Sequence, residues 1–229
     1  MHRTISDATA EAAADRPLPA VPRHADLVFR AGVRWELPRP GAVVTEVREA
    51  GAVRLGSGRL VVADPGHLDS EAEPFTVGVE PGEYPVEVAP ARFADDPEHL
   101  RVAAARLVVT REPAVSWELA VVAGQDVADL GEDEFYGFGV DTGTACFVDA
   151  DAAAALGAWL DDNHDTAYDG VFEAHAAPMR DPSTGHGLVA FTSGWGDGSY
   201  PTWIGRAADG GVTCFVVDTF VLHGATPRP

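Results

Sequence analysis

Short runs of β-favouring residues, separated by turn residues, recur along most of the chain and limit the folds that it can adopt. In the first half these runs are residues 42–47, 60–63, 84–88, 102–110 and 115–122, and in the second half 136–140, 144–148, 187–192, 200–205 and 212–217. Runs rich in β-branched and aromatic residues and bounded by Gly, Pro and Asp are typical of strands. Because short turns join antiparallel neighbours, the pattern predicts mostly antiparallel sheets.

Two segments carry a helical signal instead. Residues 151–162 contain four successive Ala residues followed by Leu156, Trp159 and Leu160, which combine high helix propensity with an apolar face. A short helix is also expected at residues 24–31. The predicted fold class is therefore α+β: a β-rich protein with mostly antiparallel sheets and one or two helices in its second half.

The N-terminal residues differ in composition from the rest of the chain. Residues 1–23 are rich in Ala, Pro and charged residues and hold few large apolar side chains, so we expect a disordered tail. Residues 24–229 are long enough to bury a sizeable core. We expect them to form a single β-rich domain, or two closely packed lobes at 24–124 and 125–229.

Acidic residues dominate the charge of the chain. The 229 residues carry a formal net charge of -20. Residues 1–115 hold 13 Arg against 18 acids, whereas residues 116–229 hold 3 Arg against 18 acids. Phosphate backbones and anionic membranes are bound by clustered basic residues, so this balance argues against nucleic-acid and membrane partners. A small molecule or a basic protein is the expected partner.

Residue types that are missing or rare exclude further classes. All 16 basic residues are Arg, and without Lys the chain has no Schiff-base residue for pyridoxal phosphate and no Lys-dependent phosphate loop. Cys146 and Cys214 each lie inside an apolar run, as small core residues do, rather than in a disulfide framework. No secretion signal or membrane-spanning stretch is evident, so we expect a soluble, cytoplasmic protein.

The segment at residues 136–149 is rich in Gly and Asp. Its glycines do not have the dinucleotide-binding spacing, and a strand-like run follows them where a helix would be needed, so no nucleotide cofactor is expected. Asp141, Thr142 and Gly143 resemble half of an aspartic-protease site, but the chain has no second copy of this motif. The alternative is that Asp141 stabilises a tight turn.

The segment at residues 191–203 is the most distinctive in the chain. Gly194, Gly196 and Gly198 alternate with Ser193, Trp195 and Asp197. One interpretation is a turn-rich connection whose glycines adopt positive φ. The other is a loop in which Ser193 and Asp197 line a pocket walled by Trp195, Tyr200 and Trp203. Asp64, at the end of the 60–63 run and before Pro65, is either a site residue or an ordinary turn residue.

Together, these segments resemble a known family. Residues 58–65, 81–86, 117–120, 136–149 and 193–218 are similar to the bacterial family catalogued as domain of unknown function 4241. The chain matches the family's Ser-Gly-x-Gly-Asp-Gly motif at residues 193–198. It departs from the family's Asp-Pro-Cys motif, because Gly66 stands where the Cys is expected. The resemblance implies no activity.

Two functional hypotheses follow. In the first, the protein is a small-molecule binder or a hydrolase-like enzyme, with Asp64, Asp141, Ser193 and Asp197 as catalytic residues. Ligand contacts would come from Trp195, Tyr200 and Trp203. A converging set of carboxylates would favour magnesium, manganese or calcium over zinc, since the His residues are scattered. In the second hypothesis, the acidic second half binds a basic protein, as an immunity-type protein does.

Overall fold

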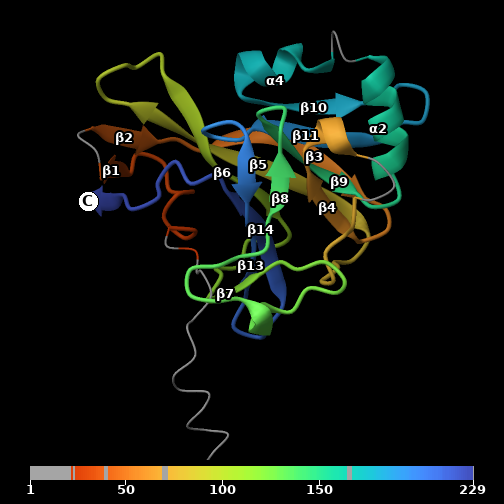
Figure 1. Ribbon diagram of the computed structural model, residues 1–229, viewed down its shortest axis with the longest axis horizontal. Helices are drawn as coiled ribbons and strands as arrows, with labels where there is room; N and C mark the ends of the chain where they lie inside the picture. The colour runs from red at the N-terminus through yellow and green to blue at the C-terminus, as the bar shows by residue number, and fades with distance from the viewer. Residues whose placement is uncertain (1–21, 23, 39–40, 69–71, 164–166, 229) are drawn as a thin grey trace, which may run out of the picture.

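The computed structural model describes residues 22, 24–38, 41–68, 72–163 and 167–228 (Figure 1). The tail expected at residues 1–23 lies outside the described residues except for Pro22 and therefore stays a prediction. Within the described ranges, no helix has the length and apolar character needed to cross a bilayer.

The strands of the described chain form antiparallel sheets, as the sequence predicts. The larger sheet, over the described residues, contains nine strands in the order β15 (Thr226–Arg228), β1 (Arg34–Glu36), β2 (Ala42–Thr45), β5 (Gly82–Phe93), β6 (Leu100–Val108), β14 (Val212–Asp218), β13 (Thr202–Arg206) and β7 (Ser116–Leu119), with β3 (Arg48–Leu55) also paired to β5. A smaller sheet has the order β10 (Ala176–Arg180), β11 (Gly187–Thr192), β9 (Thr144–Asp149) and β4 (Leu60–Ala63). β8 (Phe138–Val140) and β12 (Gly198–Tyr200) form a separate pair.

The smaller sheet lies between the larger sheet and two helices, α2 (Ala153–Asp162) and α4 (Asp169–Ala174) (Figure 1). Strand β9 shows the consequence, because all six of its residues are buried. Alternate side chains of a strand point to opposite faces. Ala145 and Phe147 therefore pack toward the larger sheet, while Cys146 and Val148 pack toward the helices.

The predicted helix at residues 151–162 is confirmed as α2, which begins two residues later. Its Leu156 and Leu160 are buried on the smaller sheet. Gly157 faces the loop after β4, where a Cβ atom would lie 1.7 Å from the carbonyl oxygen of Leu68. A residue without a side chain is therefore needed for the helix to approach this closely.

The helix expected at residues 24–31 is wrong. This segment forms turns, in which the amides of Leu27 and Val28 both donate to the carbonyl of His24. Val28 and Phe29 pack on the outer face of the larger sheet, in a cluster that includes Trp35. The segment forms turns instead of a helix, and in this conformation the adjacent side chains of Val28 and Phe29 both pack on the sheet.

Residues 144–149 (Thr-Ala-Cys-Phe-Val-Asp) and 213–218 (Thr-Cys-Phe-Val-Val-Asp) are similar in sequence, but they do not form adjacent strands. β9 lies in the smaller sheet and β14 in the larger one. Phe147 and Phe215 do share the core between the two sheets. Both Cys residues are buried and unpaired, as expected for small core residues.

Candidate functional site

Asp64 lies at the end of β4 and is only 1% exposed. Its carboxylate accepts hydrogen bonds of 2.8 Å from the amides of Gly66, Asp141 and Thr142, and one of 2.7 Å from the Thr142 hydroxyl. We call Asp64, Gly66, Asp141 and Thr142 the Asp64 cluster. Its four donors satisfy a buried carboxylate and join the end of β4 to the loop after β8.

The charge on Asp64 affects two neighbouring acids. Burial, followed by the negative charge of Asp64, raises the pKa of the Tyr168 hydroxyl to about 12. The same two causes raise the pKa of the buried Cys146 thiol far above its usual range. The thiol therefore stays protonated and cannot act as a nucleophile at neutral pH.

Ser193 lies next to the Asp64 cluster, but its hydroxyl has a local partner. The Ser193 amide donates to the carbonyl of Gly143 at 3.0 Å, which connects the two Gly/Asp-rich segments. The Ser193 hydroxyl and the Tyr200 hydroxyl each donate to the carbonyl of Gly196 at 2.8 Å. Ser193 is 1% exposed. This geometry stabilises the 193–196 turn, and a catalytic Ser193 stays a prediction.

Asp141 directly follows strand β8, and Asp197 directly precedes its paired strand β12. Gly198 pairs with Val140, so the two acids lie one residue beyond the last paired position, opposite each other in register. Both side chains are exposed. Among the described residues, no group of three or more His, Cys, Asp or Glu side chains could hold a metal ion.

Trp195 lies on the surface at the tip of the 193–198 loop, where it is 54% exposed. Its ring meets Phe93 edge-to-face at 6.0 Å, and the Arg101 guanidinium lies 5.7 Å from the ring centroid. These contacts come from the β5–β6 hairpin. Trp195 is therefore separate from Trp203, which the sequence placed in the same pocket.

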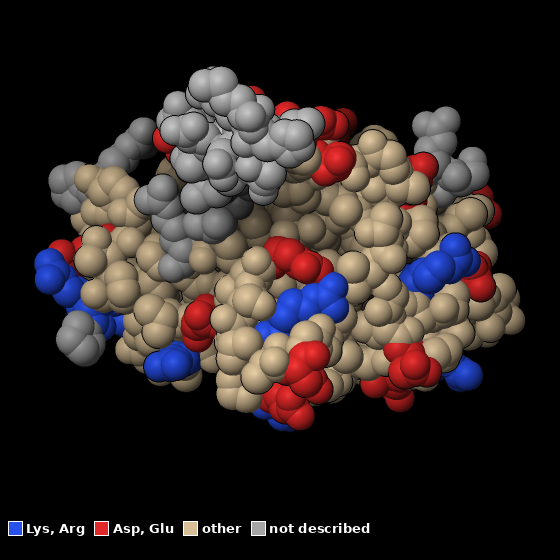
Figure 2. Space-filling model, turned by 90° about the horizontal axis from the view of Figure 1, so that it is seen from below, with Lys and Arg blue, Asp and Glu red and all other residues tan. Residues whose placement is uncertain are grey.

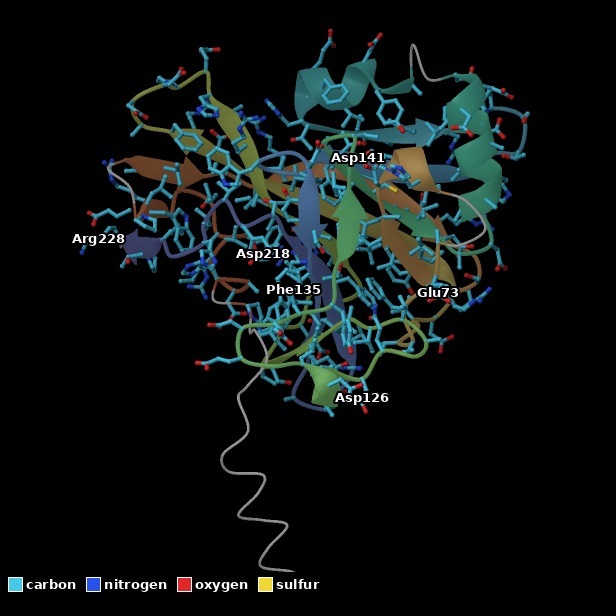
Figure 3. All side chains as sticks on the ribbon, in the orientation of Figure 1. Glu73, Asp126, Phe135, Asp141, Asp218 and Arg228 are labelled. Carbon is cyan, nitrogen blue, oxygen red and sulfur yellow. The ribbon has the colours of Figure 1, made fainter. Side chains whose placement is uncertain are left out.

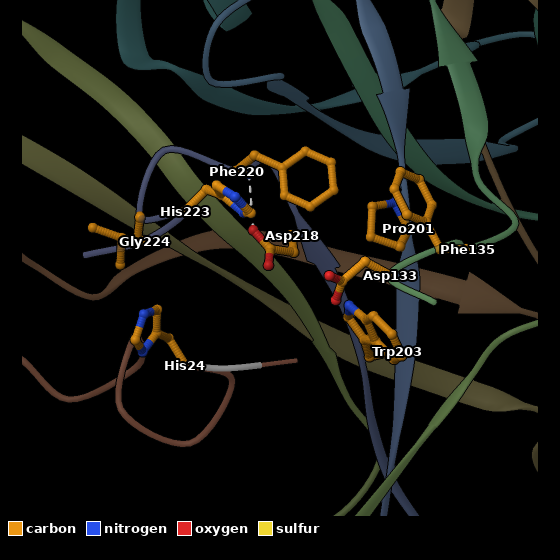
Figure 4. A pocket seen from close by; sticks show the side chains of 10 residues that line it. His24, Asp133, Phe135, Pro201, Trp203, Asp218, Phe220, His223 and Gly224 are labelled. Carbon is orange, nitrogen blue, oxygen red and sulfur yellow. Dashed lines mark hydrogen bonds between the residues drawn. The ribbon is translucent and has the colours of Figure 1, made fainter. Parts of the chain in front are cut away.

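Trp203 instead lines a cavity of about 630 Å³ on another side of the β8–β12 pair (Figure 4). The lining residues come from four distant segments of the chain: His24, Asp133, Phe135, Pro201, Trp203, Asp218, Phe220, Leu222, His223 and Gly224. Figure 3 shows Phe135 and Asp218 on this side and Asp141 at the opposite end of β8. We call this the Asp218 cavity. Its volume falls in the range of small-molecule sites.

Asp218, the last residue of β14, faces the cavity (Figure 4). Its carboxylate accepts a hydrogen bond of 2.8 Å from the Phe220 amide. Burial raises the pKa of this carboxyl above its ordinary value, against the smaller opposing effects of that hydrogen bond and of His223. Asp218 is thus a poorly solvated acid with few partners.

Two further features of the cavity wall are costly to maintain. The indole nitrogen of Trp203, a residue only 3% exposed, has no hydrogen-bond partner in the described part of the chain. Phe220 has φ 60°, in the left-handed region that bulky residues rarely adopt. Unpaired buried donors and strained backbone are both enriched at functional sites.

Tyr200 connects the two regions. Its hydroxyl bonds to the 193–196 turn, while its ring lies 5.9 Å from that of Phe220 in the cavity wall. Of the predicted site residues, the structure joins Asp141 to Asp64 through a hydrogen bond and Ser193 to Gly143 of the same loop, and only Trp203 is among the lining residues of the cavity. The sequence analysis missed Asp218, although an acid at the end of a buried strand run was the same signal that identified Asp64.

Comparison with known proteins identifies a family but no described relative. Searches of the curated proteins and of the solved structures found no match to the chain. The sequence profile of one family, described as protein of unknown function (DUF4241), matches residues 53–217. This range includes the whole Asp64 cluster and ends one residue before Asp218. Because the match covers most of the chain, the protein belongs to the DUF4241 family.

Proposed function

We propose that this protein binds a small molecule in the Asp218 cavity. The observation that carries the proposal is that two polar groups in one concave, aromatic wall lack the partners that buried groups normally have. They are the Trp203 indole N–H, without an acceptor, and the Asp218 carboxylate, with a raised pKa. A buried donor without a partner costs about 1–3 kcal/mol, which a ligand acceptor would recover.

The position of Ser193 favours ligand binding in this cavity over hydrolysis by a Ser nucleophile. Ser193, the predicted nucleophile, does not line the cavity, and its hydroxyl donates to the Gly196 carbonyl. Nucleophilic catalysis requires a base that accepts the hydroxyl proton. A carbonyl oxygen cannot play that role.

Nuclear magnetic resonance of the indole N–H groups tests the proposal. The chain has five Trp residues, and Trp203→Phe identifies the Trp203 signal in the spectrum of the parent protein. A fragment library should contain compounds that shift the Trp203 signal and leave that of Trp195, on the surface loop, unchanged. The proposal fails if the library yields no compound that shifts Trp203.

A second candidate function is the binding of a basic protein, which one surface segment favours. The loop at residues 126–134 carries five exposed acids, Asp126, Asp129, Glu132, Asp133 and Glu134. On the face shown in Figure 2, however, acidic and basic side chains occur in small interspersed groups. Titration with a Lys-rich peptide distinguishes binding at the acidic loop from binding in the cavity. If the loop binds the peptide through its charge alone, Asp129→Asn and Asp133→Asn should lower the affinity equally. If the peptide binds in the cavity, the affinity should depend on Asp133.

A further inference from the structure

We propose that the ligand of the Asp218 cavity is an organic cation, an ammonium or guanidinium group carried on an apolar body. This inference rests on the proposed function, because it names the class of ligand for the same site. It follows from the charges of the cavity lining, from the missing partners of Asp218, and from the aromatic walls.

The charged groups of the cavity are carboxylates. Asp133 and Asp218 come from different segments, and both line the cavity, whereas no Arg is among its described lining residues. Figure 4 shows the Asp133 carboxylate directed toward Asp218, and the Asp218 carboxylate next to the turn that holds Phe220 and His223. The other titratable groups that face Asp218 are the imidazoles of His24 and His223. A cation entering this space meets attraction from two acids and no fixed positive guanidinium.

Asp218, which is partly exposed at the cavity, differs from the fully buried acids of the described residues. Glu87 is paired with Arg106 and Arg111. Asp149 accepts from the Ser57 amide and hydroxyl and from the Asp151 amide. Asp64 and Asp181 likewise accept three or more hydrogen bonds each.

By contrast, Asp218 accepts a single hydrogen bond from the described residues, and no ion pair there involves it. A desolvated carboxylate regains stabilisation from an opposite charge within about 4–6 Å. Whereas Glu87 is paired with Arg106, Asp218 pairs with no Arg of the described residues and lines the cavity.

Aromatic rings supply the remaining recognition. The rings of Phe135 and Phe220 lie 5.4 Å apart, and Trp203 forms another wall. The faces of aromatic rings attract cations, and most strongly when the cation is desolvated. The same rings favour an apolar ligand body. The Trp203 indole N–H adds one donor, which a hydroxyl or carbonyl oxygen on the ligand would accept.

The surrounding charge favours the approach of a cation. Asp133 belongs to the acidic loop at residues 126–134, which has five exposed acids and no Arg. A cleft bordered by charges of one sign raises the local concentration of ligands of the opposite sign.

Three probes of similar shape test the charge requirement on the full-length protein: 2-phenylethylamine, 2-phenylethanol and 3-phenylpropanoate. Calorimetry at pH 7.5 and low salt measures affinity, and the Trp203 indole signal reports where each probe binds. We expect the amine to bind at least about tenfold more tightly than the alcohol, the difference that one charge-assisted hydrogen bond gives. The carboxylate should bind more weakly than either.

Matched variants locate the interaction. Asp218→Asn preserves the acceptor for the Phe220 amide and should weaken the amine about tenfold while leaving the alcohol unchanged. Asp129→Asn removes one exposed charge from the same acidic loop without touching the cavity lining, and it should change the amine affinity by less than about threefold.

The outcomes separate the two proposals. If the amine and the alcohol bind with equal affinity, or if Asp218→Asn has no effect on the amine, the proposal that the ligand is a cation is overturned. Shifts of the Trp203 signal would then still support the proposal that the cavity binds a small molecule. No Trp203 shift with any of the three probes overturns the proposal of a cation, whereas the proposal of a small-molecule cavity is overturned when the fragment library also yields no compound that shifts Trp203. A hexalysine peptide that shifts Trp203 more strongly than the amine, with the same dependence on Asp218, supports the cation and assigns its source to a protein side chain.

Discussion

Asp64 and Asp218 occupy equivalent positions in two strands but have opposite surroundings. Each ends a buried strand run, and each accepts the amide of the residue two positions later. Asp64 has three further donors and is sealed in the fold. Asp218 has no further donor among the described residues and borders a cavity. An acid at the end of a strand is therefore not by itself evidence of a binding site. The evidence for Asp218 is that it lacks the hydrogen-bond donors that satisfy Asp64.

The two regions also differ in their relation to the family. The Asp64 cluster lies inside the range that matches DUF4241, whereas Asp218, Phe220 and His223 lie beyond its end. The Asp64 cluster is thus part of the architecture covered by the family match. The ligand class of the Asp218 cavity is a property argued for this chain from its own residues.

Removing the Asp64 carboxylate should have the largest effect. Asp64→Ala removes the buried carboxylate that accepts from Gly66, Asp141 and Thr142, and so breaks the connection between the end of β4 and the loop after β8. We expect the free energy of unfolding to fall by about 3–5 kcal/mol, measured by urea denaturation. Asp209→Ala, at an exposed turn, serves as the control. A loss below about 1 kcal/mol for Asp64→Ala would show that the cluster is not the structural element described above.

Crowding the same cluster should have an intermediate effect. In Gly66→Ala, the new Cβ atom would lie 2.7 Å from Cγ2 of Thr142 and 3.3 Å from Oδ1 of Asp64. We expect a loss of about 1–3 kcal/mol in urea denaturation. Thr142→Ser removes the Cγ2 atom and keeps the hydroxyl that donates to Asp64, so the double variant should recover part of the loss. Strictly additive losses would contradict this geometry.

Removing the Asp218 charge should have a smaller effect of opposite sign. A carboxyl with a raised pKa contributes stability that is fully present below its unfolded-state value of about 3.9 and is lost as pH rises through the folded-state value. At neutral pH, Asp218→Asn should therefore raise the melting temperature, because it removes a charge that burial disfavours.

The advantage of Asp218→Asn should shrink as the pH falls toward about 4, because the parent carboxyl then becomes neutral. Melting curves of both proteins between pH 4 and 7.5 measure the difference, with Asp129→Asn as the control for loss of a surface charge. A variant that melts below the parent at neutral pH would indicate that Asp218 is a satisfied structural acid like Asp64.

The strands could be predicted from sequence where buried residues form uninterrupted runs. Residues 60–63 and 187–192 coincide with β4 and β11, because both faces of the smaller sheet are covered and the central residues of these runs are apolar and buried. β3 was missed because charged and small residues make up most of it, and because its pairing with β5 shifts in register between Glu49 and Gly51. The run at 200–205 divides at Pro201, which cannot donate to a sheet.

The candidate site was less accessible to sequence reasoning. The Asp64 cluster could be located through its strand ends, but its donors come from a loop 77 and 78 residues away, so its role depends on the folded arrangement. The Asp218 cavity draws its walls from residues near 24, 133, 201 and 220. No local motif unites these segments, and only Trp203 was anticipated.

A titration of the Asp218 side-chain carboxyl by carbon-detected magnetic resonance tests the central claim most directly. The account predicts that, without ligand, the pKa of this group lies above the ordinary value of about 3.9, because the cavity desolvates it. Addition of 2-phenylethylamine should lower that pKa, since the cation stabilises the ionised carboxylate. An ordinary pKa in the free protein, or a raised pKa that the amine leaves unchanged, would contradict it.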